Sequence, residues 1–214
     1  MIKAFLLIFE PEQTWDGVAR SPRSVAYLFV TFLLPMVLLQ AAAEGFGLVH
    51  WGKWRPGAAS SLLRQFPLNE VVVYEVLQAA LSLAVVFIAA KTLKSFGETF
   101  HVRHTYKEAF KTIAYGLSPL FVVRLLDAFR SVSPWPVWFA TWGIGVVLCM
   151  VVLYHGLPRV MLPDPPQAFG LYVMTSLVIL LITGLARGLT GWYLSGDFVP
   201  LERLIKALAP RLPF

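Results

Sequence analysis

The stretch that decides the fold runs from Lys94 to Asp127 and reads KSFGETFHVRHTYKEAFKTIAYGLSPLFVVRLLD. Its first third is the densest polar segment of the chain. The remainder is an apolar helical pattern with Gly116 and Pro119 inside it and Arg124 near its end. Apolar runs long enough to cross a bilayer, about 20 residues each, lie on both sides of it. The stretch therefore predicts a membrane protein with a polar turn and an interrupted span at its centre.

The composition points to the same class of protein. Hydrophobic residues make up 57% of the 214 residues and charged residues 14%, whereas soluble domains carry about 25% charged residues. The single cysteine, Cys149, excludes an intrachain disulfide and argues against a thiolate metal site. The formal charge is +6 without a long basic run. Basic residues in such a chain anchor its ends in anionic headgroups, so we expect no nucleic-acid partner and no cofactor.

Five apolar stretches predict an all-α bundle of five transmembrane helices. They cover about residues 24–49, 69–93, 106–129, 137–157 and 167–194. Together they define one membrane domain over residues 24–194.

Short interfacial helices are predicted at both ends of this domain. In residues 1–23, the apolar segment from Met1 to Phe9 is too short to span the bilayer, and Trp15 is expected at the membrane surface. Residues 195–214 predict an amphipathic helix, because leucine and isoleucine recur on one face and Arg203 and Lys206 lie elsewhere.

Proline and glycine predict the irregular positions. Pro35 in the first span, and Gly116 with Pro119 in the third, predict kinks, with gating hinges as the alternative. Residues 158–166 contain four prolines and predict a stiff, non-helical loop. Gly184 and Gly188 in the fifth span are spaced as a small-residue pair for helix packing.

The distribution of basic residues predicts the orientation. Nine lie on the amino-terminal side and seven on the other, or nine against four without residues 195–214. Because cytoplasmic loops are enriched in lysine and arginine, we expect the amino terminus in the cytoplasm.

Charged residues inside the spans form the first candidate site. Antiparallel spans bring a set of them into one leaflet: Glu44, Glu70, Glu75, Arg124, Asp127 and Arg187. Charges in hydrocarbon are costly and tend to face the bundle and pair. We predict that the two deepest, Glu75 and Arg187, form a buried pair. The alternative is that these side chains reach the interface by snorkelling.

The polar loop offers a weaker candidate for a metal site. Glu98, His101 and His104 are spaced by threes, and histidine with carboxylate is metal-ligand chemistry. Residues at this spacing do not stay on one helical face, and Arg103 would repel a cation. We therefore favour a solvated loop and expect no metal.

Two short segments resemble a known family. Phe96-Gly97 followed by Phe100, and then Ala114-Tyr115-Gly116-Leu117-Ser118-Pro119 in the next span, resemble the Yip domain family of Ypt/Rab-interacting membrane proteins. Pro11 in a short helix before the first span resembles the short prokaryotic-type members. The resemblance implies a five-helix membrane domain over nearly the whole chain, in the inner membrane of a bacterium.

The predicted function is non-enzymatic, since no nucleophile, zinc or phosphate-loop motif is present. We expect a protein that binds membrane lipids and partner membrane proteins, or a second copy of itself, and organises the bilayer. The resemblance implies Rab-type GTPase binding for eukaryotic relatives, which carry long cytosolic amino-terminal regions. Only about two dozen residues precede the first span here, so we expect no such partner. The alternative is a small transporter or channel that uses the intramembrane charges.

Overall fold

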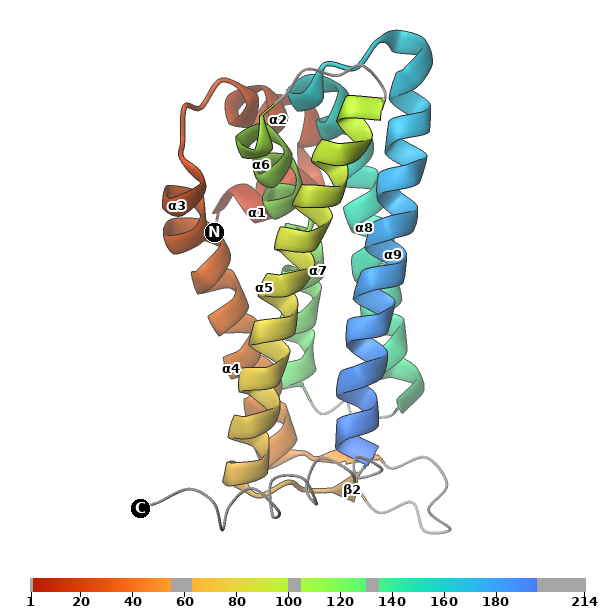
Figure 1. The fold of residues 1–214 in the computed structure, drawn as a ribbon. Coiled ribbons are helices and arrows are strands. Elements are labelled where there is room, and N and C mark those ends of the chain that lie inside the picture. The colour runs from red at the N-terminus through yellow and green to blue at the C-terminus, as the bar shows by residue number, and fades with distance from the viewer. Residues whose placement is uncertain (1, 55–62, 100–104, 130–134, 196–214) are drawn as a thin grey trace, which may run out of the picture.

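The computed structural model describes residues 2–54, 63–99, 105–129 and 135–195, and these are almost wholly helical (Figure 1). Five stretches are long and apolar enough to span a membrane: Val25–His50, Leu68–Thr99, Tyr106–Ala128, Phe139–Met161 and Pro165–Leu194. The predicted all-α fold with five membrane-spanning helices is confirmed. The predicted helix at residues 195–214 lies outside the described residues.

The elements follow the chain in order. The helices α1 (Ile2–Phe9) and α2 (Pro11–Ala19) precede the first span, which consists of α3 (Val25–Leu28), the π-helical turn η1 (Phe29–Leu33) and α4 (Leu34–His50). The two-residue strands β1 (Lys53–Trp54) and β2 (Leu63–Arg64) pair antiparallel. The second span is α5 (Leu68–Thr99). The third consists of α6 (Tyr106–Gly116), α7 (Ser118–Val123) and the 3-10 helix η2 (Arg124–Ala128). The helices α8 (Trp135–Met161) and α9 (Pro165–Ser195) contain the fourth and fifth spans.

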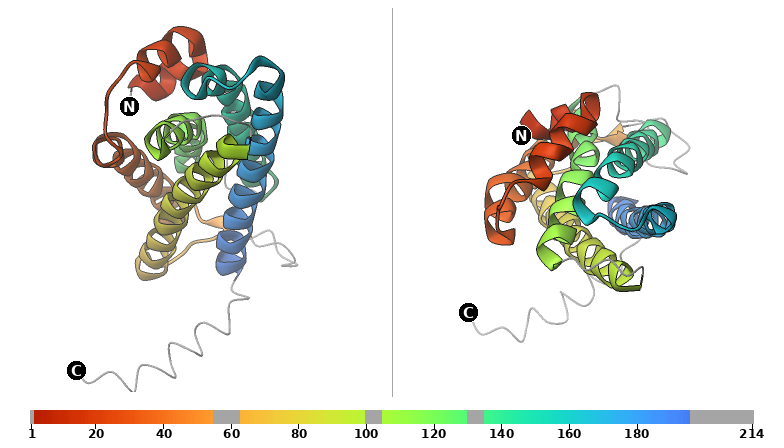
Figure 2. Two further views of the ribbon diagram at one scale, coloured as in Figure 1. Left: turned by 45° about the horizontal axis from the view of Figure 1, so that its top comes forward. Right: turned by 90° about the horizontal axis from the view of Figure 1, so that it is seen from above.

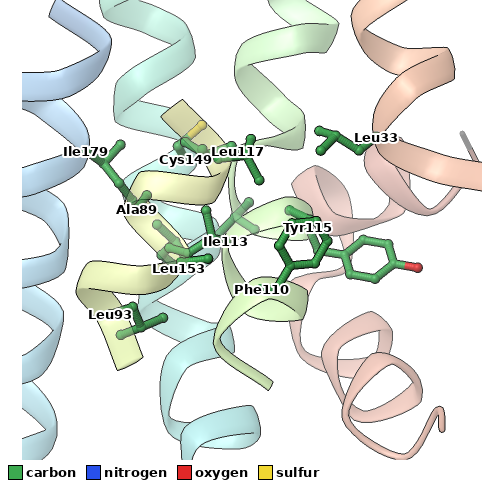
Figure 3. Packing of buried hydrophobic residues seen from close by; sticks show 14 of the residues in the cluster. Leu33, Ala89, Leu93, Phe110, Ile113, Tyr115, Leu117, Cys149, Leu153 and Ile179 are labelled. Carbon is green, nitrogen blue, oxygen red and sulfur yellow. The ribbon is translucent and has the colours of Figure 1, made fainter. Parts of the chain in front are cut away.

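The third span is the centre of the bundle. Of its apolar window 83% is buried, against 22–50% for the other four spans. Seen from above, α6 lies among the surrounding helices (Figure 2). Its Ile113 packs in a cluster with Ala89 of α5 and Leu153 of α8 (Figure 3). The short hydrophobic stretch of α6 and α7 is therefore protein core, while the outer spans present apolar side chains to lipid.

The helices α1 and α2 pack against the bundle at the end where the first span begins (Figure 1). Trp15 of α2 is fully buried against the bundle, and its predicted depth at the membrane surface stays a prediction. Its Nε1 donates a hydrogen bond to the carbonyl oxygen of Val152 in α8 at 2.9 Å. The indole ring occupies the space that a side chain at Gly156 would need. The sequence did not reveal this site because the glycine that makes room lies on a distant helix.

Two loop predictions need correction. The polar segment from Lys94 was predicted as a loop, but α5 continues to Thr99. The helix α8 likewise continues through Pro158 to Met161, although residues 158–166 were predicted to be non-helical. Pro158 lies in the last turn of α8, where a missing amide donor costs only one hydrogen bond. The connection between α8 and α9 is therefore shorter than expected.

The predicted irregular positions coincide with breaks in the helices. Gly116 is the last residue of α6, and Pro119 lies in the first turn of α7. A side chain at Gly116 would collide with Leu153. Pro35 is in the first turn of α4, directly after the π-helical turn η1. Proline cannot donate to the residue four positions earlier, which accounts for the altered helical winding before it.

Candidate functional site

A cluster of four charged side chains lies inside the bundle near the end opposite α1 and α2. We call it the charge cluster and define it as Glu44 of α4, Arg124 and Asp127 of η2, and Arg187 of α9. Their side chains are at most 5% exposed. Two positive and two negative groups balance one another, which meets the requirement that charges in a membrane be compensated.

Glu44 is the acceptor shared by both guanidinium groups. One of its oxygens is paired with Arg124, and the other lies 3.4 Å from Nη1 of Arg187. Asp127 also lies close to both arginines. Its Oδ2 is 3.7 Å from Nε of Arg124 and 3.7 Å from Nη2 of Arg187. Each cation therefore faces both anions, and the removal of any one member would leave a net buried charge.

The 3-10 winding of η2 brings two of these residues together. Side chains three residues apart are eclipsed in a 3-10 helix, so Arg124 and Asp127 extend from the same face. The close approach of α4 supports this arrangement, because a side chain at Gly47 would overlap the carbonyl oxygen of Asp127. The backbone of η2 can thus lie directly against α4.

Polar side chains from three helices complete the charge cluster. The Tyr74 hydroxyl donates to Glu44 Oε1 at 2.9 Å, and Thr141 Oγ1 lies 3.5 Å from Asp127 Oδ1. With its amide assigned to satisfy both neighbours, Gln78 directs its oxygen toward Arg124 Nη2 at 2.7 Å and its nitrogen toward Thr190 at 3.2 Å. These polar residues were not predicted from the sequence. The signal was their helical spacing: Gln78 lies four residues after Tyr74, and Thr190 three after Arg187.

A small cavity of about 30 Å³ adjoins the charge cluster, bordered by Arg124, Arg187, Gln78 and Thr183. A cavity needs only roughly 10–15 Å³ of such space to hold a water molecule. The cavity therefore has room for water beside the two guanidinium groups.

Glu75 lies on a different side of α5. Successive helical residues are rotated by about 100°, so Glu75 is turned away from the face of Tyr74 and lies against Gly45 of α4. It lines a groove of about 510 Å³ between α4 and α5, which we call the α4–α5 groove. Arg187 contacts Glu44 and Asp127 instead of lying alone with one carboxylate, and the Glu75–Arg187 pair stays a prediction.

The remaining predicted positions fall elsewhere. Gly184 faces Trp142 of α8 at ordinary contact distance, whereas open space surrounds Gly188. Glu98 pairs with Lys94 at 3.4 Å. The other two candidate metal ligands, His101 and His104, lie outside the described residues. No group of three metal-ligating side chains occurs within the part of the chain that the structure describes.

Comparison with known proteins gives a single match. Residues 5–187 match the family model of the Yip1 domain. The matched range extends from α1 to Arg187 and so includes every member of the charge cluster. The comparisons with curated proteins and with solved structures gave no match.

Proposed function

The chain belongs to the Yip1 domain family, and we propose that it is a non-enzymatic membrane protein that binds other membrane proteins and lipids and thereby organises the bilayer. The observation that carries this proposal is the closed charge cluster. Its four charged side chains are at most 5% exposed and use one another as partners. Such a group holds three spans together and leaves interaction to the outer surface of the bundle.

The α4–α5 groove supports the same proposal. It lies between two membrane-spanning helices and is bordered by small residues, among them Ala41, Ala42, Gly45 and Ala79. Small side chains let the backbones of neighbouring membrane helices approach closely. Glu75 and His50 add polar groups at the groove. A transmembrane helix, from a partner protein or a second copy, fits these features.

The experiment fills the α4–α5 groove with a large side chain and measures which proteins co-purify with the variant. The variant Ala42→Trp places an indole in the groove, and Ala140→Trp places one on an exposed position of α8 as the matched control. The proteins are extracted in native-lipid discs and their associated proteins quantified by mass spectrometry, with differently tagged copies to detect self-association. We expect Ala42→Trp to lose an associated chain that Ala140→Trp retains. Equal association in all three proteins would overturn the groove as the contact site.

A small transporter or channel is the alternative that the intramembrane charges suggest. The ion pairs within the charge cluster argue against it, because each charged group already has partners inside the bundle. A flux assay in vesicles separates the two functions. If the protein is a transporter, the unaltered protein should show flux, and the double variant Glu44→Leu with Arg124→Leu should fold but show none. If the charge cluster is structural, the unaltered protein should show no flux.

The orientation that we propose places the amino terminus in the cytoplasm of a bacterium, with the protein in its inner membrane. The excess of basic residues on the side of α1 and α2 supports it. A reporter fused after Phe214 should then lie outside the cytoplasm, and one inserted between Thr99 and Thr105 inside it. The reverse labelling would overturn this orientation.

A further inference from the structure

A second groove lies near the other end of the bundle, where α5 ends and α6 begins. Its volume is about 400 Å³, and it is lined by Phe87, Ile88, Lys91, Lys94 and Tyr106. We call it the α5–α6 groove. The ends of two membrane-spanning helices meet here, on the same end as α1 and α2 (Figure 1). The groove therefore lies at the boundary between the hydrocarbon and the headgroups.

The α5–α6 groove is apolar at its deeper end and basic at its rim. Phe87, Lys91 and Lys94 lie at positions i, i+4 and i+7 of α5 and share one face of the helix. With a rise of 1.5 Å per residue, Lys94 lies roughly 10 Å further along the helix than Phe87. Phe87 and Ile88 are 37% and 52% exposed, so apolar surface remains uncovered below the lysines.

Aromatic packing holds the deeper end in place. The Phe87 ring lies 5.2 Å from that of Phe110 in α6 and 5.9 Å from that of Phe29 in η1. Tyr106 packs 6.1 Å from Phe110. The walls of the groove are thus formed before any ligand arrives, which lowers the entropy cost of binding.

The charge at the rim selects the sign of the ligand. Lys94 pairs with Glu98 at 3.4 Å, and Lys91 is exposed. Two lysines and one glutamate leave one positive charge in excess. A ligand that contacts both the lysines and the apolar end of the groove needs an anionic group roughly 10 Å from an apolar chain. An anionic phospholipid has both of these groups.

We propose that the α5–α6 groove binds an anionic phospholipid, with its phosphate between Lys91 and Lys94 and an acyl chain over Phe87 and Ile88. The position at the membrane boundary favours a lipid over a peptide, because lipid is present there at high local concentration with its phosphate at the matching depth. This inference deepens the proposed function, since it names the class of lipid that the protein would recognise.

The experiment measures which lipids remain bound. The purified full-length protein is equilibrated in mixed micelles with equal amounts of phosphatidylglycerol and phosphatidylcholine, and the bound lipids are counted by native mass spectrometry. The test variant is Lys91→Gln with Lys94→Gln. The matched control is Arg20→Gln with Lys107→Gln, which removes the same charge at the same end without altering the lining of the groove.

We expect the unaltered protein and the control to retain phosphatidylglycerol preferentially. The test variant should lose this preference by roughly five-fold or more, since a lysine near an anionic lipid surface contributes about that factor. Loss of preference in both variants would overturn the proposal, because the general basic field would then suffice. No preference in the unaltered protein would also overturn it, while the Ala42→Trp result would remain a separate test of the proposed function.

Two further measurements separate a lipid from a free phosphate ester. Soluble glycerol phosphate in excess should leave the bound phosphatidylglycerol in place, since it cannot cover the apolar end. Ile88→Asn should weaken retention although both lysines remain. Displacement by glycerol phosphate, or full retention in Ile88→Asn, would overturn the acyl-chain contact and with it the lipid.

Discussion

The two halves of the third span use different means to bury the side chains that face the bundle. In α6, Phe110, Ile113 and Tyr115 are fully buried among apolar side chains from the surrounding helices. In η2, Arg124 and Asp127 are also buried but lie among charges. One half is held mainly by apolar packing, and the other by ion pairs whose members come from three separate spans.

This difference determines how each half responds to substitution. Apolar packing is non-directional, so loss of one contact costs the contact and any cavity that remains. A buried ion cluster has no such tolerance, because removal of one member leaves its partners charged and uncompensated. The η2 half therefore fixes the rotation of each helix about its own axis, whereas the α6 half supplies close packing.

The largest effect should follow loss of Arg124. The variant Arg124→Leu leaves Glu44 and Asp127 with one cation between them and should lower the free energy of unfolding by about 4 kcal/mol. The double variant Glu44→Leu with Arg124→Leu restores the charge balance and should recover much of that loss. Denaturant unfolding in mixed micelles measures both. A single variant as stable as the unaltered protein would show that the charge cluster does not hold the helices together.

The corresponding test of the apolar packing around α6 is Trp15→Ala, because the Trp15 ring of α2 lies 6.4 Å from that of Tyr115 in α6. It removes a fully buried indole and its hydrogen bond to Val152 and should cost about 3 kcal/mol. Since the loss falls on α2, we expect the segment before Ser21 to become sensitive to protease before the spans unfold. The control Trp192→Ala alters a half-exposed residue and should change neither quantity. Protection equal to that of the unaltered protein would mean that α2 is held in place by other contacts.

A smaller effect should follow removal of the neutral hydrogen-bonding group at Gln78. The variant Gln78→Leu keeps the four charges but deprives Arg124 and Thr190 of their amide partner. The expected loss is about 1.5–3 kcal/mol, the usual range for a hydrogen bond to a charged group. If Gln78→Leu and Arg124→Leu proved equally damaging, charge balance would not be what distinguishes the two halves.

The smallest effect should come from ion pairs outside the core. Arg159 pairs with Glu12 at 3.3 Å and Asp16 at 3.3 Å, and both carboxylates are more than half exposed. Arg159→Gln should therefore cost less than about 1 kcal/mol and lose even that difference in high salt. A large, salt-independent loss would show that these contacts are shielded from solvent.

The spans could be predicted from the sequence because their signal is local. Each is an apolar run whose length matches the bilayer, and each predicted span overlaps a helix long enough to cross a membrane. Antiparallel alternation of the spans alone predicted which leaflet holds the charges. It did not predict which charged side chains contact one another, because hydropathy does not report the rotation of a helix about its axis. One step along α5, from Tyr74 to Glu75, separates the charge cluster from the α4–α5 groove.

The errors share a physical origin in distant contacts. The burial of Trp15 was not predicted, because the space that it fills is left by Gly156 on α8. Pro158 was expected to end its helix, yet it needs only the loss of one hydrogen bond in the last turn. The partner of a residue in a membrane bundle often lies on another span, and local sequence propensity does not predict such a contact.

The order of synthesis places a particular demand on the charge cluster. Glu44 leaves the ribosome 80 residues before Arg124 and 143 residues before Arg187. At about 5–20 residues per second, the first interval lasts roughly 4–16 s. During that time the first span carries its carboxyl group without either cation, which is a costly state for a charge in a bilayer. The four charges balance only when the fifth span has been made.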